Sequence, residues 1–316
     1  MNALMSTPRL DGRTALVTGG NSGLGFQTAR HLARAGARVL LACRRLESAD
    51  EAVRLLRQEL PDAALYPLHL DLADLDSIKR AAAEVVRQYS EIDLLINNAG
   101  VMALRTRGIT RQGFELQFGT NHLGHFALTL HLLPLLLKRP GARVVTVSAL
   151  RHRGGKIDFE DLNSERRYSP WQAYSQSKLA NLLFAQELHR RMQARRLQLL
   201  SVAAHPGLAS TQLFLNGPGL GASSVMRRIL KVISGIIGQS AERGAWPQLY
   251  AATSPDAVSG GYYGPSGPVE LRGVPGNAKL SAQAQDVDTA RRLWTVSEKL
   301  AGVSLEDSLT KAGGIA

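Results

Sequence analysis

Short apolar segments alternate with amphipathic ones along most of the chain. Near-continuous hydrophobic runs, typical of buried strands, occur at 14–19, 38–43, 64–72, 92–100, 142–149 and 197–205. Between them, helical spacing of apolar residues covers 24–36, 48–60, 74–89, about 114–138 and about 171–195. Because parallel strands need crossovers that cover both faces of their sheet, this alternation predicts a doubly wound, Rossmann-like α/β domain.

Two helix ends are also predicted. Gly36 stands just past the helix over 24–36, where glycine is a usual terminator. Ser48 opens the helix over 48–60 and is expected to be its N-cap. No linker, composition break or internal repeat divides the chain, so we expect a single domain over residues 1–316.

The composition is that of an ordinary globular protein. Hydrophobic residues make up 44% and charged residues 20%, which is enough to bury a core. Cys43 is the only cysteine, so no disulfide forms within the chain and a reducing compartment fits. The first residues, MNALMSTPRLDG, hold no apolar core of signal-peptide length, and no apolar run approaches the roughly 18 residues of a spanning helix. We therefore expect a soluble, cytoplasmic protein.

The formal net charge of +12 raises the question of a polyanionic partner. The charges are scattered and mostly arginine, without long runs of one sign, zinc-ligand spacing or an aromatic–basic repeat. We therefore do not expect nucleic-acid binding.

A glycine-rich turn, TGGNSGLG (18–25), lies where the first predicted strand meets a helix. Gly19, Gly23 and Gly25 would let the backbone approach a pyrophosphate, and the helix N-terminus would donate N–H groups to it. The spacing is G-x3-G-x-G, because Thr28 occupies the last glycine of the commoner fingerprint. Such a turn alone is weak evidence, and its place after the first strand strengthens it.

The end of the second predicted strand bears on the choice of dinucleotide. An acidic residue there would bind the ribose 2′-OH of NAD, but this chain has Cys43, Arg44 and Arg45. Arginine suits a 2′-phosphate by its charge and its forked donors. The alternative is a pair of solvated arginines at the start of a helix. We favour NADP(H), since no carboxylate competes at the strand end.

Other strand ends carry Asp71, Asn97–Gly100, Ser148 and Pro206–Gly207. Each could serve turn chemistry alone, but ligands of such sheets bind at the carboxyl ends of strands, so together these residues outline one crevice.

Tyr174 and Lys178, in AYSQSKLAN (173–181), are four residues apart and would share one helix face. Bringing a tyrosine pKa from about 10 to about 7 takes about 4 kcal/mol. A cation about 4 Å away supplies about that much at an effective dielectric constant of about 20. Chance produces such pairs too, so the assignment depends on the surrounding motifs.

Six ordered motifs resemble those of the short-chain dehydrogenases/reductases: TGGNSGLG (18–25), LDLADL (70–75), NNAG (97–100), TNHLGHF (120–126), YSQSK (174–178) and HPG (205–207). The stretches at 156–188 and 290–300 are similar to those of the retinol-dehydrogenase-like group. The resemblance covers about residues 11–302, which we take as the core of the domain.

The resemblance implies three catalytic residues. Tyr174 would be the general acid/base, Lys178 would lower its pKa and hydrogen-bond the nicotinamide ribose, and Asn121 would hold a water in a proton relay. The implied reaction is reversible hydride transfer between NADP(H) and a lipophilic, retinoid-like alcohol, aldehyde or ketone. With the two arginines, the expected cofactor-binding residues are Gly19, Asn21, Ser22, Gly23, Leu24, Gly25, Arg44, Arg45, Asp71, Leu72, Asn98, Ala99, Gly100, Tyr174, Lys178, Pro206, Gly207 and Thr211.

Two features depart from the family pattern. Related proteins often carry an N-terminal membrane anchor, and none is predicted in this sequence. More seriously, the family has a catalytic serine at the position of Ala149, within Val147-Ser148-Ala149. Ser148 is the neighbour, and adjacent strand residues point to opposite faces. Either the enzyme is slow on ordinary carbonyls, or another donor replaces the serine. The alternative function is an NADP(H)-binding sensor or scaffold with weak turnover.

The segment at about 208–240 corresponds to the family's substrate lid. Within it, SVMRRILKVISGII (224–237) has a wide apolar arc opposite Arg227, Arg228 and Lys231. Packing on its own domain, a lid over a lipophilic substrate and contact with a membrane surface all fit, the last being least favoured. The expected partner is a small lipophilic substrate, and the chain is expected to be a monomer or a homodimer.

Overall fold

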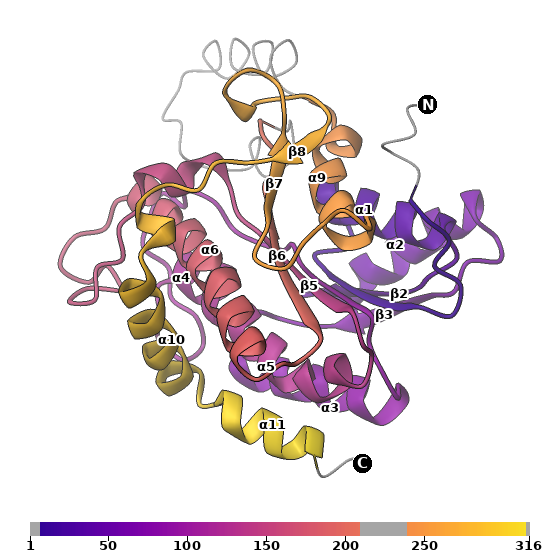
Figure 1. Cartoon of the computed structure of the whole chain (residues 1–316), viewed down its shortest axis with the longest axis horizontal. Coiled ribbons are helices and arrows are strands. Elements are labelled where there is room, and N and C mark those ends of the chain that lie inside the picture. Colours follow the sequence, from indigo (N-terminus) through magenta and orange to yellow (C-terminus); the bar gives the residue numbers. More distant parts are fainter. Residues whose placement is uncertain (1–6, 209–238, 314–316) are drawn as a thin grey trace.

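The computed structural model describes residues 7–208 and 239–313. Its centre is an eight-stranded sheet in the order β3-β2-β1-β4-β5-β6-β7-β8 (Figure 1). The first seven strands are parallel, and β8 runs antiparallel to β7. Their bounds are β1 (Thr14–Thr18), β2 (Arg38–Cys43), β3 (Leu65–His69), β4 (Leu94–Asn97), β5 (Ala142–Val147), β6 (Leu199–Ala204), β7 (Tyr262–Pro265) and β8 (Pro275–Asn277).

The strand order creates a crevice at one edge of the sheet. Val17 of β1 pairs with Leu41 of β2 on one side and with Ile96 of β4 on the other. The chain therefore changes direction across the sheet between β3 and β4, and this switch point opens at the carboxyl ends of β1 and β4. The six predicted strands and their parallel arrangement are confirmed.

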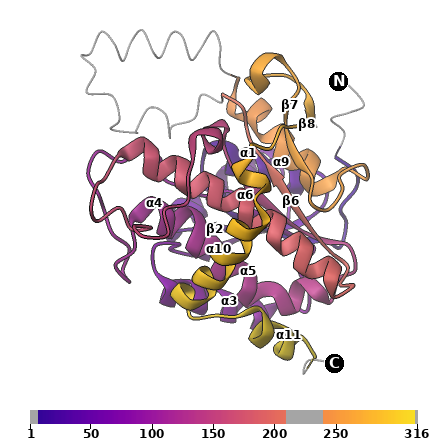
Figure 2. The ribbon, with the colours of Figure 1, turned by 60° about the vertical axis from the view of Figure 1, so that its left-hand side comes forward.

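Helices cover both faces of the sheet (Figures 1 and 2). Leu16 of β1 packs into the cluster on one face, while Ala15 and Val17 pack into the other, as strand alternation requires. One face carries α1 (Gly23–Arg34), α2 (Leu46–Glu59) and α9 (Ala241–Thr253). The other carries α3 (Leu75–Gln88), α5 (Gly124–Leu137), α6 (Pro170–Ala194), α10 (Val287–Ala301) and α11 (Leu305–Gly313). Shorter turns are α4 (Leu116–Phe118), η2 (Gly119–Leu123), η3 (Leu150–Gly154), η4 (Pro268–Glu270) and η5 (Gln283–Gln285).

One predicted helix end is right and one is wrong. Gly36 follows the C-cap of α1 with φ +96°, a left-handed conformation that favours glycine. Ser48, by contrast, is not an N-cap. The connection after β2 is so short that the helix begins at Leu46, with Arg45 as its N-cap, and Ser48 lies inside the first turn.

The helix expected over about 114–138 is a continuous helical stretch of three parts: α4, η2 and α5. The Glu115 carboxylate starts it by accepting hydrogen bonds from the backbone N–H groups of Gln117 (3.0 Å) and Phe118 (2.7 Å). The middle part is a π-helical turn that contains Asn121. A turn of this kind often marks a functional site, because the extra residue changes where nearby side chains point.

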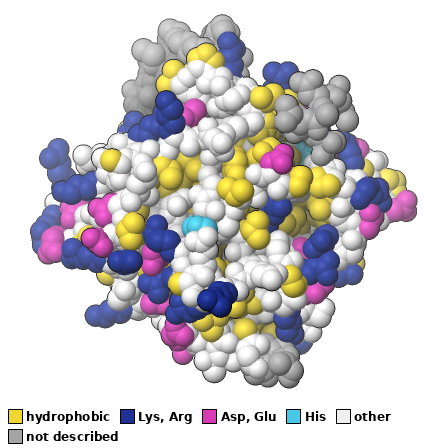
Figure 3. Space-filling model, viewed as in Figure 1, with side chains coloured by type: hydrophobic (Ala, Val, Ile, Leu, Met, Phe, Trp, Pro, Cys, Tyr) yellow, Lys and Arg dark blue, Asp and Glu magenta, His cyan; other side chains and the backbone are white. Residues whose placement is uncertain are grey.

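Some expectations fall outside the described residues. Thr211, the amphipathic stretch at 224–237 and nearly all of the segment at 208–240 belong to this group. Among residues 7–208 and 239–313, no helix combines the length and the hydropathy that crossing a membrane requires. On the face in Figure 3, Lys and Arg side chains are spread between acidic ones rather than gathered in one patch.

Candidate active site

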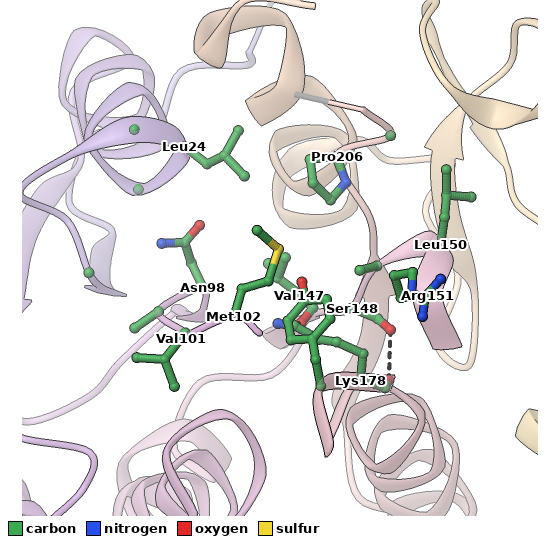
Figure 4. Close-up of a pocket in the computed structure, with 18 of the residues that line it drawn as sticks. Leu24, Asn98, Val101, Met102, Val147, Ser148, Leu150, Arg151, Lys178 and Pro206 are labelled. Atoms are coloured by element: carbon green, nitrogen blue, oxygen red, sulfur yellow. Dashed lines mark hydrogen bonds between the residues drawn. The ribbon is translucent and has the colours of Figure 1, made fainter. Parts of the chain in front are cut away.

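A pocket of about 610 Å³ opens at the carboxyl ends of β1, β4, β5 and β6 (Figure 4). Thirteen of the expected site residues line it: Gly19, Asn21, Ser22, Gly23, Leu24, Gly25, Asn98, Ala99, Gly100, Tyr174, Lys178, Pro206 and Gly207. The pocket has two sides, with Leu24 and Asn98 on one and Leu150 and Arg151 on the other.

The glycine-rich turn has the geometry of a phosphate cradle. Gly19 and Gly23 have φ values of +66° and +53°, which side chains rarely tolerate. A Cβ on Gly25 would overlap the carbonyl oxygen of Gly19 and lie 2.6 Å from Nδ2 of Asn98. Ser22 is the N-cap of α1, but its side chain makes no capping hydrogen bond. The first N–H groups of the helix are thus free to bind an anion.

Thr18 ties this turn to the loop after β4. Its hydroxyl oxygen accepts hydrogen bonds from the backbone N–H groups of Asn98 (2.9 Å) and Ala99 (3.0 Å). The Asn98 side chain donates to the Thr18 carbonyl at 2.8 Å. These bonds hold the two loops in one fixed arrangement.

Arg44, Arg45, Asp71 and Leu72 lie outside the pocket lining. Arg44 and Arg45 are exposed at the end of β2, and neither side chain pairs with another described residue. The Asp71 carboxylate accepts a hydrogen bond from the N–H of Ala73 at 2.9 Å, which shapes the turn after β3. Leu72 is buried.

Asn121 and Lys178 meet behind Gly100. The Asn121 side chain accepts from the N–H of Val101 (2.8 Å) and donates to the Val101 carbonyl (2.9 Å) and to Ser177 Oγ (2.9 Å). A Cβ on Gly100 would lie 3.0 Å from Asn121 Oδ1 and 3.6 Å from Lys178 Nζ. The missing side chain of Gly100 thus leaves room for both groups, although Asn121 itself does not reach the pocket lining.

Tyr174 lies on the side of the pocket that holds Arg151 and Trp171, and only 5% of its surface is exposed. Its ring makes an edge contact with Trp171 at 6.3 Å between centroids, and Lys178 Nζ lies 5.8 Å from its ring centre. Burial raises the pKa of the Tyr174 hydroxyl above its ordinary value, and the Arg151 guanidinium partly opposes this. Burial also lowers the pKa of Lys178 to about 8.

The expectation that Lys178 brings the Tyr174 pKa towards neutrality stays a prediction, since the described residues by themselves raise this pKa. Desolvation is the larger effect, and the cation that opposes it is Arg151. At neutral pH the Tyr174 hydroxyl is protonated, which is the form that can give a proton to a carbonyl oxygen.

The Ser148 hydroxyl is engaged within the protein. It is buried and donates a hydrogen bond to the carbonyl of Lys178 at 2.7 Å (Figure 4). Ala149, the next residue, lines the pocket. Ser148 lines the same pocket, with its hydroxyl directed at the carbonyl of Lys178, so its pointing away from the crevice stays a prediction.

Pro206 and Gly207 are held by a buried layer behind the pocket. The Gly207 N–H donates to His205 Nδ1 at 3.1 Å, so Nε2 carries the proton and donates to Glu270 at 3.0 Å. Burial lowers the pKa of His205, which favours this neutral tautomer. Gly207 has φ +64° and close backbone neighbours, so a side chain there would disturb the turn.

Sequence reasoning missed Arg151, Trp171 and Met102, which also line the pocket. The Arg151 guanidinium carbon lies 5.0 Å from the ring centre of Trp171. In a chain whose basic residues are mostly arginine, a single arginine carries no signal of its own. The only feature of the sequence that could have indicated Arg151 as a pocket residue is its position two residues after Ala149.

Comparison with known proteins identifies the family. The profile of the short chain dehydrogenase family matches residues 13–216. Human retinol dehydrogenase 13 is 40% identical over 304 residues, covering 95% of this chain and 88% of that protein. Mouse polyprenol dehydrogenase is 38% identical over 307 residues, covering 95% and 87%. The crystal structure of an uncharacterised protein from Mycobacterium paratuberculosis is 40% identical with a TM-score of 0.78, covering 96% of this chain and 98% of that one. The chain thus belongs to the short-chain dehydrogenase/reductase family, in its retinol-dehydrogenase-like group.

Proposed function

We propose that this protein is an NADP(H)-dependent oxidoreductase that interconverts a lipophilic alcohol and its carbonyl compound. Membership of the family establishes an oxidoreductase acting on alcohols or carbonyls. The observation that carries the finer proposal is the pocket itself, where a phosphate cradle and an apolar wall meet at Tyr174.

The residues present fit a nicotinamide dinucleotide. The free N–H groups of α1 and the side-chain-free surfaces of Gly19 and Gly25 suit a pyrophosphate. Arg44 and Arg45 would hold the 2′-phosphate of NADP(H), because both are exposed and neither pairs with another described residue. Lys178 would hydrogen-bond the nicotinamide ribose. When bound, the nicotinamide supplies or accepts the hydride.

Tyr174 is assigned the proton transfer. Its buried hydroxyl stays protonated at neutral pH, so it can donate to the carbonyl oxygen as that oxygen gains charge. The same raised pKa keeps the deprotonated form of Tyr174 scarce at neutral pH, so alcohol oxidation, which needs that form as a base, should need a higher pH than reduction. Trp171 packs against the Tyr174 ring, and Val147 and Leu150 add apolar surface to the same pocket.

The substrate is inferred to be lipophilic. Met102, Leu150, Trp171 and Leu208 add apolar surface to the pocket, and its volume of about 610 Å³ is within the usual range of ligand pockets. The names of two similar proteins, retinol and polyprenol dehydrogenase, refer to long apolar alcohols. The alternative of a sensor or scaffold rests on Ala149 alone, and no comparison supports it. The cytoplasmic location and the monomeric or homodimeric state stay predictions.

Steady-state kinetics with a substrate panel would test the proposal. Hexanal, decanal and retinal would be reduced with NADPH or NADH, and the matching alcohols oxidised with NADP+. We expect kcat/KM to favour NADPH and to rise with chain length. Equal or better kcat/KM with NADH would overturn the cofactor assignment, and a preference for short polar aldehydes would overturn the substrate class.

A further inference from the structure

The reacting oxygen of a substrate needs more than one hydrogen-bond donor. A carbonyl oxygen has two lone pairs, and it gains negative charge as the carbonyl carbon receives hydride. Tyr174 supplies one donor. Around it, the pocket wall consists of Val147, Ser148, Ala149, Leu150, Arg151 and Trp171. Three of these have apolar side chains, and the Ser148 hydroxyl is already bonded to the carbonyl of Lys178.

The remaining candidates at this end are Arg151 and Trp171. Trp171 offers a single neutral indole N–H, whereas Arg151 offers five N–H donors and a positive charge. Charge-assisted hydrogen bonds are about twice as strong as neutral ones. Arg151 is therefore the better match for an oxygen that becomes negative.

The Arg151 guanidinium is held near Tyr174 and is not otherwise engaged. It stacks 5.0 Å above Trp171, whose ring in turn contacts Tyr174 at 6.3 Å. Its side chain forms no hydrogen bond or ion pair with any residue in 7–208 or 239–313. Arg153, two residues further along the same turn, differs in this respect because it pairs with Glu270 at 2.8 Å.

We propose that Arg151 donates a hydrogen bond to the substrate oxygen beside Tyr174, in place of the hydroxyl that Ala149 lacks. This inference rests on the proposed function. In the reduction, the carbonyl carbon receives a hydride from reduced nicotinamide, the π electron pair moves to oxygen, and that oxygen takes the Tyr174 proton. Arg151 keeps its own proton throughout, because a guanidinium stays charged at any working pH.

The placement explains how the site can function without a serine at position 149. The side chain of Arg151 is long and flexible, so its guanidinium can reach a substrate oxygen, whereas Ala149 has only a methyl group and no donor. Stacking on Trp171 limits the conformations that Arg151 samples, which lowers the entropic cost of ordering it. The positive charge also favours a bound oxygen that carries partial negative charge over a purely hydrocarbon group.

Kinetics of four variants would test the assignment with decanal and NADPH. Arg151→Ala should lower kcat by about 10² to 10³, as expected for loss of one such donor. Arg87→Ala, at an exposed arginine in the last turn of α3, is the control and should stay within about twofold of the parent. Trp171→Phe keeps an aromatic ring under Arg151 and removes the indole N–H, so it should cost less than about tenfold.

Rescue provides a signature that a structural role would not give. Introducing Ala149→Ser into the Arg151→Ala protein should restore at least about tenfold in kcat, because a hydroxyl then replaces the lost donor. Full activity of Arg151→Ala, or loss without any rescue, would overturn the proposal. Loss that affects 4-carboxybenzaldehyde but not benzaldehyde would also overturn it, since Arg151 would then bind a substrate carboxylate.

A binding measurement separates this inference from the proposed reaction. Decanamide presents a carbonyl oxygen that NADPH does not reduce, and its affinity for the NADPH-bound protein can be measured by calorimetry. Arg151→Ala should weaken decanamide at least about tenfold while leaving NADPH affinity within about twofold. If the parent protein reduces no aldehyde but decanamide binding still depends on Arg151, the donor role stands and the reaction fails. Decanamide affinity that ignores Arg151 would refute the donor role whatever the turnover.

Discussion

The two sides of the pocket differ in whether backbone or side chains form them. The cofactor side is mostly backbone, from the turn of Gly19, Gly23 and Gly25 and the loop at Asn98, and its shape depends on the absence of side chains. The substrate side is mostly side chains, and Arg151 and Trp171 meet there from separate segments. A backbone cradle suits a ligand common to many enzymes, whereas a side-chain wall can change with each substrate.

The largest expected effect is the loss of kcat when Tyr174, on the substrate side, is replaced by Phe. The ring would still pack against Trp171, but no proton could be donated, so kcat should fall by about 10³ to 10⁴. NADPH affinity, measured by fluorescence titration, should change only a few fold because the cofactor side is intact. A variant that retains most of its activity would refute the role of Tyr174.

Replacing Gly25 by Val should disrupt the glycine-rich turn and thereby weaken NADPH binding. Its Cβ would overlap the Gly19 carbonyl, so the turn must open and NADPH binding should weaken by at least about 10². Gly154→Ala is the matched control, because a Cβ there meets no atom within 4 Å. Thermal melting of both variants would show that the fold persists. Unchanged NADPH affinity in Gly25→Val would contradict the cradle.

Replacing Arg44 by Asp should change the preference between NADPH and NADH without altering the substrate side of the pocket. Loss of a charged partner for the 2′-phosphate should lower kcat/KM with NADPH by about 10- to 100-fold and leave NADH nearly unchanged. Arg54→Asp, within the helix α2 that follows Arg44 and Arg45, provides the control for added negative charge. Equal losses with both cofactors would argue against a phosphate contact.

The smallest expected effect is a pH dependence on the cofactor side. Because burial lowers the pKa of Lys178 to about 8, its ammonium is present below that pH and is lost as the pH rises through it. NADPH affinity should then decline several fold between about pH 7 and pH 9. Lys178→Met should bind NADPH more weakly and show no such decline. A parallel decline in both proteins would assign the titration to another group.

The sequence predicts local geometry best where one short segment holds all the necessary information. Gly19, Gly23 and Gly25 lie within one turn, so strand, turn and helix could be recognised together. The N-cap at Ser48 failed because the start of α2 depends on the length of the connection from β2, and a single capping residue does not define it.

The parallel sheet, its covering helices and the glycine turn could all be predicted from the sequence. The spacing of apolar residues and the backbone conformation depend on residues that are neighbours in the chain. Only the tertiary structure decided what the side chains touch. It bonds Ser148 to the carbonyl of Lys178, 30 residues away, and stacks Arg151 on Trp171 beside Tyr174. It also decided the Tyr174 pKa, since the cost of burying a charge depends on everything packed around it. Such contacts join residues whose spacing along the chain has no fixed period, so no local pattern records them.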